Sequence, residues 1–413
     1  MIPRLVFLLE IPANPADKDR FGFEQLRSAG VIPEIWDLSP IYFPHATSIE
    51  FSPPVGIDAH LVRSTSELDA LVQSLTSQDT ILLIGASTES RIWRWRECLK
   101  IIFASQARIT ALAFGAVPNV YLEPQVMAWG NRQIRRARTV VTRPHVISEQ
   151  LFRRWERLLV RLPRLRARVL PVWALDHIWV GTFAEEISPL IVSERTAVKY
   201  IHELDYDLVL RESPRNPDEC NYMVFLGFGG QDADLLRIDH YLEPEKRAET
   251  LARFFDKLES LTGHPIVIAS HPRARPGRFE PFFGGRPVIY HETARLISQA
   301  SLVLSSNDST AISMVVAFQR PMMMISSSHF EPAQSRVCQM MERLLGVTSL
   351  SADGSIDHFE WPEVDQALYT AYFERYVKRP GTPETAFWRV VAADIHAANL
   401  TPVGDGKKSP TGE

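Results

Sequence analysis

Two stretches decide the fold of this sequence: LVLSSNDSTAI at residues 302–312 and VIASHPR at residues 267–273. Each begins as a short apolar run rich in β-branched residues and stops at polar side chains. This pattern is typical of a buried parallel strand in an open α/β sheet, because helices cover both faces of such a strand. Ligands of these sheets bind outside the carboxyl ends of the strands. We therefore expect the polar residues after each run to line a ligand site.

Length and composition limit the class of protein. The chain has 413 residues, 45% of them hydrophobic and 23% charged, which predicts a soluble globular protein of two domains. A net charge of -4 argues against a nucleic-acid partner. Every apolar run is shorter than the roughly 20 residues of a membrane span. Three scattered cysteines predict neither a disulfide framework nor a zinc site. We expect a cytoplasmic protein.

The first half alternates short apolar strands with helices. Gly30 closes the first helix, at a position where glycine commonly ends helices. Strand, helix, glycine and strand in this order open a βαβ unit. The pattern predicts a Rossmann-like domain over residues 1–212, with strands at 4–9, 33–37, 80–85 and 109–113 and helices at 21–29, 66–75 and 90–105.

A polar stretch with two prolines, residues 213–219, predicts a linker. The same alternation resumes after it and predicts a second, doubly wound α/β domain over residues 218–382. Its strands are expected at 222–226, 267–271, 288–290, 302–305 and 321–325, and its helices at 245–261, 293–300 and from about Ser309. A last helix is expected at 383–399, followed by a disordered tail at 401–413.

The polar end of the 302–312 stretch predicts a phosphate site. Hydroxyl groups and free backbone N–H groups meet there at the start of a helix, where the helix dipole favours an anion. The residues that would bind the phosphate are Ser305, Ser306, Ser309 and Thr310. The alternative interpretation is that Asp308 or Ser309 only caps the helix.

Three further residues of the second half are candidates for the same ligand. His271 can bond a phosphate oxygen or protonate a leaving phosphate, and Arg273 adds a positive charge. Alternatively, His271 packs in a turn at the end of its strand. Glu292 stands before a helix, between the two stretches, and can accept hydrogen bonds from ribose hydroxyls; alternatively, the helix dipole alone favours it there.

Glycines 227, 229 and 230 follow another strand in the sequence GFGG. Asp232 breaks the GxGxxG spacing, so a nicotinamide dinucleotide is disfavoured. Gly229 and Gly230 still allow a sugar or phosphate to approach the backbone closely.

In the first half, carboxylates at strand ends are candidates for a general base that deprotonates an acceptor hydroxyl. Glu10 and Asp37 follow two of the strands, and Glu89 follows a third. Asp205 and Asp207 near the domain junction are further alternatives. The sequence does not choose among them.

Residues 131–168 contain twelve arginines and no lysine. One interpretation is a basic amphipathic helix that contacts anionic lipid at a membrane surface. The other is a solvated helix whose apolar stripe, Leu151, Trp155, Leu158 and Leu162, packs in the core. Pro163 and Pro171 keep any membrane contact short.

With these motifs, the sequence resembles bacterial glycosyltransferases of the GT-B architecture that assemble surface polysaccharides. It is most similar to the sialyltransferase-like and Kdo-transferase-like groups, which use CMP-activated sugars. Those groups share a His-Pro motif, matched by His271-Pro272, and a Ser/Thr motif, matched by Ser305-Ser306 and Ser309-Thr310. Residues 21–38 and 202–207 also resemble proteins of surface-carbohydrate gene clusters.

The resemblance implies two Rossmann-like doubly wound domains that face a cleft. It further implies a nucleotide-sugar donor in the second domain, with CMP-sugar favoured over UDP-sugar, and a glycan or lipid-linked glycan acceptor in the first. Transfer would need no metal and no other cofactor, and the helix at 383–400 would pack back on the first domain. The enzyme would act in the cytoplasm, at the inner membrane if the arginine-rich stretch binds lipid.

The sequence departs from these groups at the acidic motif that carries their base. Glu185-Glu186 is followed by Ile187, where the groups have glycine. Two alternatives to a glycosyltransferase therefore stay open. One is a non-catalytic GT-B-like subunit of a polysaccharide assembly complex, and the other is an enzyme such as a nucleotide-sugar epimerase on the same scaffold.

Overall fold

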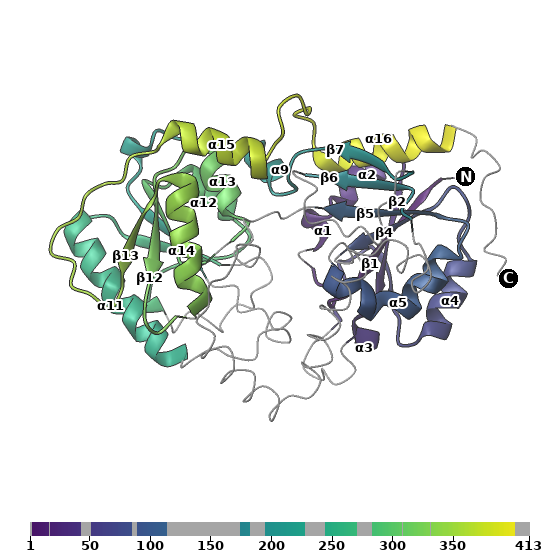
Figure 1. Ribbon diagram of the computed structural model, residues 1–413, viewed down its shortest axis with the longest axis horizontal. Helices are drawn as coiled ribbons and strands as arrows, with labels where there is room; N and C mark the ends of the chain where they lie inside the picture. The colour runs from purple at the N-terminus through teal and green to yellow at the C-terminus, as the bar shows by residue number, and fades with distance from the viewer. Residues whose placement is uncertain are drawn as a thin grey trace, which may run out of the picture.

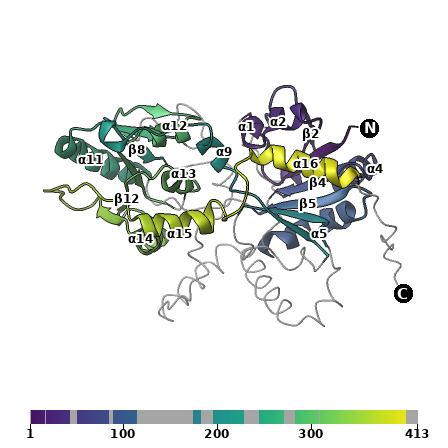
Figure 2. The ribbon, with the colours of Figure 1, turned by 90° about the horizontal axis from the view of Figure 1, so that it is seen from above.

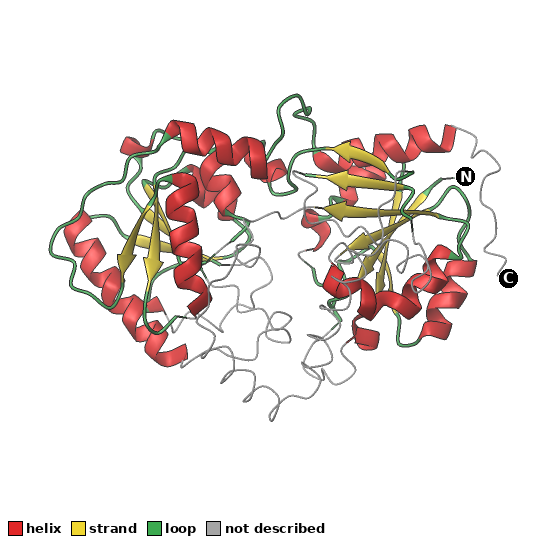
Figure 3. Ribbon diagram, in the orientation of Figure 1, coloured by secondary structure: helices red, strands yellow, loops and turns green. Residues whose placement is uncertain are grey.

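The computed structural model describes residues 2–15, 17–42, 51–84, 89–113, 174–181, 195–227, 244–270, 283–307, 309–330 and 332–400. Within these ranges the chain forms two parallel sheets with helices on both faces (Figures 1 and 3). The predicted fold class, two Rossmann-like doubly wound α/β domains, is confirmed.

The N-terminal sheet has seven parallel strands in the order β3-β2-β1-β4-β5-β6-β7. Its strands are β1 (Arg4–Leu9), β2 (Ile32–Asp37), β3 (Asp58–Leu61), β4 (Thr80–Ile84), β5 (Arg108–Ala113), β6 (His177–Val180) and β7 (Ala197–Tyr200). The helices around it are α1 (Asp17–Arg20), α2 (Phe23–Ser28), α3 (Ser39–Tyr42), α4 (Thr65–Gln73), α5 (Glu89–Phe103) and α16 (Phe387–Leu400).

Alternate side chains of β1 explain why this sheet is covered on both sides. Val6 and Leu8 pack in one core with α4 and α5. Leu5, Phe7 and Leu9 point to the opposite face, where they pack with α2 and α16. Because successive residues of a strand face opposite sides, a strand that is apolar throughout must be buried on both.

The C-terminal sheet has six parallel strands in the order β10-β9-β8-β11-β12-β13. Counted within the domain, this is the 3-2-1-4-5-6 order of dinucleotide-binding folds. Its strands are β8 (Met223–Leu226), β9 (Ile266–Ala269), β10 (Val288–Ile289), β11 (Leu302–Ser305), β12 (Met322–Ser326) and β13 (Thr348–Ser351). Its helices are α9 (Tyr206–Val209), η2 (Pro217–Glu219), α11 (Pro244–Thr262), α12 (Thr293–Ser298), α13 (Ile312–Ala317), α14 (Pro332–Leu345) and α15 (Gln366–Tyr376).

The last helix, α16, returns to the N-terminal domain. Phe387, Trp388 and Val391 are buried against the β1 face of that domain, and Trp388 Nε1 donates to the Arg20 carbonyl at 3.0 Å. Figures 1 and 2 show α15 on the C-terminal domain and α16 on the N-terminal domain. The chain therefore passes between the domains twice.

Some elements differ from the sequence predictions. The helix expected from about Ser309 begins only at Ile312, after a turn. Strands β3, β6, β7 and β13 and helices α14 and α15 were not predicted. The polar segment 213–219 was predicted to be a linker, but it lies against the C-terminal domain, where Arg215 N donates to the Ser298 carbonyl at 3.0 Å.

Within the ranges that the structure describes, no helix is long and apolar enough to span a membrane. The arginine-rich stretch 131–168 and the tail 401–413 lie outside those ranges.

Candidate functional site

The strand order places a topological switch point in the C-terminal domain between β8 and β11, because the chain winds away from these two strands in opposite directions. Ligands of open α/β sheets bind at the carboxyl ends of the strands beside such a point. Gly227 ends β8 there, and a Cβ at this position would lie 3.1 Å from the Ala269 carbonyl oxygen of β9. Glycine therefore keeps the ends of β8 and β9 close together.

Ser305 and Ser306 stand at the end of β11, beside this switch point. The Ser305 hydroxyl donates to the Asn307 carbonyl at 3.1 Å, which folds the chain back at the strand end. Ser306 is fully buried, and its hydroxyl has no hydrogen-bond partner among the described residues. A buried polar group without a partner costs about 1–3 kcal/mol. A ligand atom that accepts a hydrogen bond from Ser306 would remove this cost.

Ser309 and Thr310 form the turn that precedes α13. The Ser309 hydroxyl accepts a hydrogen bond from Ala311 N at 3.2 Å, and Thr310 is exposed. Ser309 thus stabilises the turn, which agrees with the capping interpretation of this residue. Because α13 has only six residues, its dipole is a weak basis for binding an anion.

The turn after β12 lies next to these serines, because β12 pairs with β11 and places Met324 opposite Ser305. Ser327 donates to Asp353 Oδ1 at 2.6 Å, and Ser328 N donates to the other oxygen of the same carboxylate. Burial favours the neutral acid, but these hydrogen bonds outweigh it and lower the pKa of Asp353. Ser327, Ser328 and His329 directly follow the apolar strand β12. The sequence analysis did not select these residues as part of the site.

Glu292 is not between the two stretches in space, as its position in the sequence suggested. It follows β10, the edge strand, with β9 and β8 between it and β11. Three strand spacings of about 4.8 Å separate the ends of β10 and β11 by roughly 14 Å. Glu292 is exposed and forms an ion pair with Arg295 in the same helix.

Four predicted site residues lie outside the described ranges: His271, Arg273, Gly229 and Gly230. The described residues stop at Ser270 after β9 and at Gly227 after β8. The described residues Gly227 and Ser270 follow β8 and β9 at the same edge of the sheet as Ser306.

In the N-terminal domain the switch point lies between β1 and β4. Glu10 follows β1 there and is buried. Trp95 Nε1 donates to its carboxylate at 3.3 Å, and the Tyr42 ring stacks on Trp95 with the centroids 5.1 Å apart. Burial raises the pKa of the Tyr42 hydroxyl, so this group stays neutral. Sequence reasoning selected Glu10 but not the two aromatic residues beside it.

Asp37 at the end of β2 is fully buried and bound by the backbone. Its two carboxylate oxygens accept from Ala13 N and Ser39 N, each at 2.8 Å. Burial raises the pKa of Asp37, and these hydrogen bonds counteract part of that effect. The contacts make Asp37 an anchor for the loops after β1 and β2.

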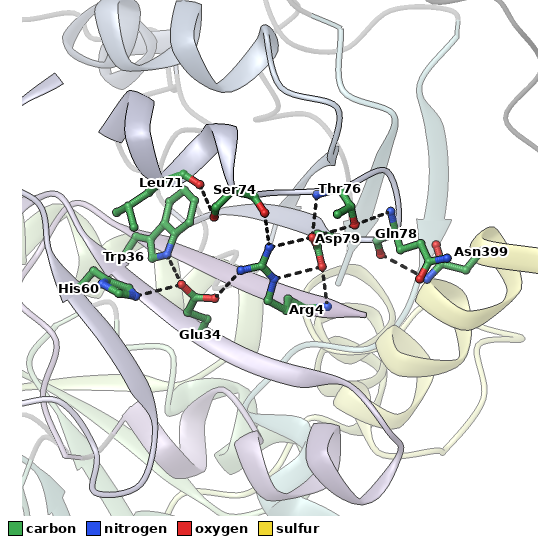
Figure 4. Close-up of polar contacts among 10 residues, drawn as sticks. All are labelled: Arg4, Glu34, Trp36, His60, Leu71, Ser74, Thr76, Gln78, Asp79 and Asn399. Atoms are coloured by element: carbon green, nitrogen blue, oxygen red, sulfur yellow. Dashed lines mark hydrogen bonds and ion pairs between the residues drawn. The ribbon is translucent and has the colours of Figure 1, made fainter. Parts of the chain in front are cut away.

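The N-terminal sheet also carries a polar network around Arg4 (Figure 4). Arg4 pairs with Asp79 at 3.0 Å and with Glu34 at 3.6 Å, and Glu34 contacts His60 at 3.2 Å. Among the described residues, Glu34, Asp58 and His60 form the one group spaced to hold a metal ion. Because Arg4, His60 and the Trp36 N–H already bind the Glu34 carboxylate, we assign no metal here.

No protein-family model and no curated protein matches this chain. Solved structures are similar at low identity. A UDP-GlcNAc 2-epimerase from Methanocaldococcus jannaschii has 10% identity and a TM-score of 0.42, with 95% of this chain and 99% of that one covered. MurG from Acinetobacter baumannii has 11% identity, a TM-score of 0.38 and coverages of 96% and 99%. A UGT transferase from Siraitia grosvenorii in complex with UDP has 13% identity and a TM-score of 0.44, with 96% of this chain and 99% of that one covered. Because these TM-scores are below 0.5 and the identities are 13% or less, we infer nothing about function from these structures.

Proposed function

We propose that this chain is a glycosyltransferase of the GT-B architecture that moves a sugar from a nucleotide-sugar donor to a glycan acceptor. The observation that carries the proposal is the buried, unpartnered hydroxyl of Ser306 at the β8/β11 switch point. A phosphate oxygen of the donor would accept its hydrogen bond. The 3-2-1-4-5-6 strand order of the C-terminal sheet supports a nucleotide there.

In this proposal the C-terminal domain stabilises the leaving phosphate. As the bond between the sugar and the phosphate oxygen breaks, negative charge grows on that oxygen. Donors already in place stabilise such charge better than water does, because they need no reorganisation. Ser306 would supply a hydroxyl donor, with Ser309 and Thr310 in the following turn. Ser305, whose one O–H already donates to the Asn307 carbonyl, would hold the end of the strand in shape. His271 would add positive charge or a proton, Arg273 would add positive charge, and Gly229 and Gly230 would let the donor approach the backbone.

For the acceptor we favour Glu10 as the general base. It follows β1 at the switch point of the N-terminal sheet, whereas both oxygens of Asp37 already accept backbone N–H groups. A base must come within hydrogen-bond reach of the acceptor hydroxyl. Glu10 would take the proton as the acceptor oxygen attacks the sugar carbon.

The finer parts of the proposal rest on the sequence resemblance. They are a CMP-activated nonulosonic or Kdo-type sugar, transfer without a metal, a lipid-linked glycan acceptor of the bacterial surface, and action in the cytoplasm. Contact of residues 131–168 with the inner membrane belongs to the same set.

Calorimetric titration of the full chain with CMP, UDP and CDP tests the proposal. We expect one of the three to bind and the others to bind at least tenfold more weakly. Binding of CMP would support the CMP-sugar assignment, and binding of UDP or CDP instead would correct the donor class. If none of the three binds, a non-catalytic subunit becomes the better explanation. Product analysis then separates transfer from epimerisation, because an epimerase changes the donor without any acceptor.

A further inference from the structure

The loop after β1, which begins with Glu10, is fixed to the N-terminal sheet through its backbone. Leu38 N donates to the Leu9 carbonyl at 2.8 Å, and Ala13 N donates to Asp37 Oδ2 at 2.8 Å. Both hydrogen bonds join this part of the chain to the end of β2. The backbone on either side of Glu10 is therefore held in place, and the orientation of the carboxylate depends on the rotation of its side chain.

Trp95 of α5 restricts that rotation. Its Nε1 donates to Glu10 Oε2 at 3.3 Å, in a buried contact between residues 85 positions apart in the chain. The indole is fully buried in the core between the sheet and helices α4 and α5. The Tyr42 ring stacks on it, with an angle of 25° between the ring planes. Because a close-packed core resists movement of its side chains, the indole N–H points to a fixed position.

The same sheet contains a second pair of an indole and a carboxylate, in a different setting (Figure 4). Trp36 Nε1 donates to Glu34 Oε1 at 2.6 Å, and Trp36 is fully buried in the same core. Arg4 and His60 also bind the Glu34 carboxylate, at 3.6 and 3.2 Å, and Glu34 lies in the middle of β2. This pair has the chemistry of the first one but lies away from the edge of the sheet where ligands bind.

We propose that Trp95 is a positioning residue for Glu10, the general base of the proposed function on which this inference rests. A glutamate side chain has two sp³ torsions with three staggered positions each, which gives about nine rotamers. The Trp95 N–H selects those that keep Oε2 at the switch point between β1 and β4. A base acts only within hydrogen-bond reach of the acceptor hydroxyl, so a fixed carboxylate speeds transfer without changing how tightly the donor binds.

The kinetics of Trp95→Phe test this role, because the variant removes the N–H and keeps an aromatic ring in the core. Transfer is measured with CMP-, UDP- and CDP-activated sugars as donors and methyl glycosides as acceptors. With the pair that the wild type uses best, we expect kcat to fall by up to about tenfold, the ratio that free rotation of Glu10 would give, and the donor KM to stay unchanged.

Trp36→Phe is the matched control, because it removes a hydrogen bond between an indole and a carboxylate from the same core. Both variants should unfold at a lower urea concentration than the wild type, but only Trp95→Phe should lower kcat. An equal loss of kcat in the two variants would show a general effect of the damaged core and would overturn the inference.

The double variant Glu10→Gln/Trp95→Phe shows whether Trp95 acts through Glu10. If it does, the double variant transfers as slowly as Glu10→Gln alone, because no base is left to position. Wild-type kcat in Trp95→Phe, or a further loss of kcat in the double variant, would overturn the inference and leave the proposed function standing. If the wild type transfers no sugar from any of the three donors, the proposed function itself fails, and the role of Trp95 fails with it.

Proton–nitrogen NMR of the indole groups tests the contact without any substrate, and it keeps the inference testable if Trp95→Phe fails to fold. In Glu10→Ala we expect the indole N–H resonance of Trp95 to move upfield, because it loses a charged acceptor. The resonance of Trp36 should stay in place. A Trp95 resonance that is the same in Glu10→Ala and the wild type would contradict the inference.

Discussion

Asp37 and Glu10 follow neighbouring strands of the N-terminal sheet, but their contacts predict different roles. Asp37 binds two backbone N–H groups, from Ala13 and Ser39. In Asp37→Asn the amide nitrogen can donate but not accept, so one of those N–H groups is left unpaired. We expect the free energy of unfolding to fall by about 1–3 kcal/mol, measured by urea denaturation.

Glu10→Gln is the matched variant, since it makes the same change of charge on the adjacent strand. We expect it to leave nucleotide affinity unchanged and to slow sugar transfer about 100-fold or more, the usual range for a lost general base. Unchanged transfer in Glu10→Gln would move the base to another residue.

Arg4 and Asp79 give a prediction about pH. Burial favours neutral Asp79, but the hydrogen bonds from Arg4 and Thr76 outweigh it and lower the pKa of this carboxyl group. A lowered pKa stabilises the fold above the unfolded value of about 3.9, and that stabilisation is lost as the pH falls through the folded value. Arg4→Met should therefore cost about 1–3 kcal/mol at neutral pH and less in acid.

Thermal unfolding over a pH series measures this difference between Arg4→Met and the wild type. Lys18→Met is the control, because Lys18 pairs with Glu24 and both side chains are largely exposed. A surface pair of this kind contributes little to stability. A cost for Arg4→Met that stays constant down to acidic pH would contradict the role given to Asp79.

At the scale of elements, the contact of α2 with α16 depends on Gly22. This residue has φ of +52°, and a Cβ there would lie 2.2 Å from Trp388 Cδ1. We expect Gly22→Ala to destabilise the protein far more than Gly263→Ala, whose φ is +70° but whose Cβ would meet nothing within 4 Å. The control has only the strain of alanine in a left-handed conformation, roughly 1–2 kcal/mol. If Gly22→Ala and Gly263→Ala unfold at the same urea concentration, α16 does not pack on Gly22 in solution.

The central strands could be predicted from the sequence because all but one residue of each is apolar. β1, β4 and β11 are buried on both faces, and their hydrophobic runs of three to five residues reveal such strands. The strands that were missed are short and carry polar residues, as Asp58 and His60 do in β3 and Lys199 does in β7. Sheet neighbours, more than their own sequence, determine their structure.

The candidate site could be predicted only as a list of residues. The sequence placed Ser305 and Ser306 at the end of a strand, but burial of Ser306 and its lack of a partner depend on the packed sheet. The distance of Glu292 from Ser306 follows from the strand order, which chain order does not give. The pairing of Ser327 with Asp353 joins two strand ends and has no local signature.

At the scale of the whole molecule, the two sheets divide the proposed chemistry. Ser306 lies at the C-terminal switch point and Glu10 at the N-terminal one, so the proposed transfer requires the two domains to work together. Residues 201–207 and 377–387 join the domains, and His202 and Asp207 of the first segment form hydrogen bonds with Thr385 and Phe387 of the second.

The central claim is that a nucleotide phosphate binds the Ser306 hydroxyl. Calorimetric titration of Ser306→Ala with the nucleotide that binds the wild type tests it most directly. A lost hydrogen bond to a charged group is worth about 1.5–3 kcal/mol, so affinity should fall about 10- to 100-fold. Ser349→Ala is the control, because Ser349 Oγ is also buried but lies on β13, beside Cys338. We predict weakened binding in Ser306→Ala alone; equal affinity in Ser306→Ala, Ser349→Ala and the wild type would contradict the claim.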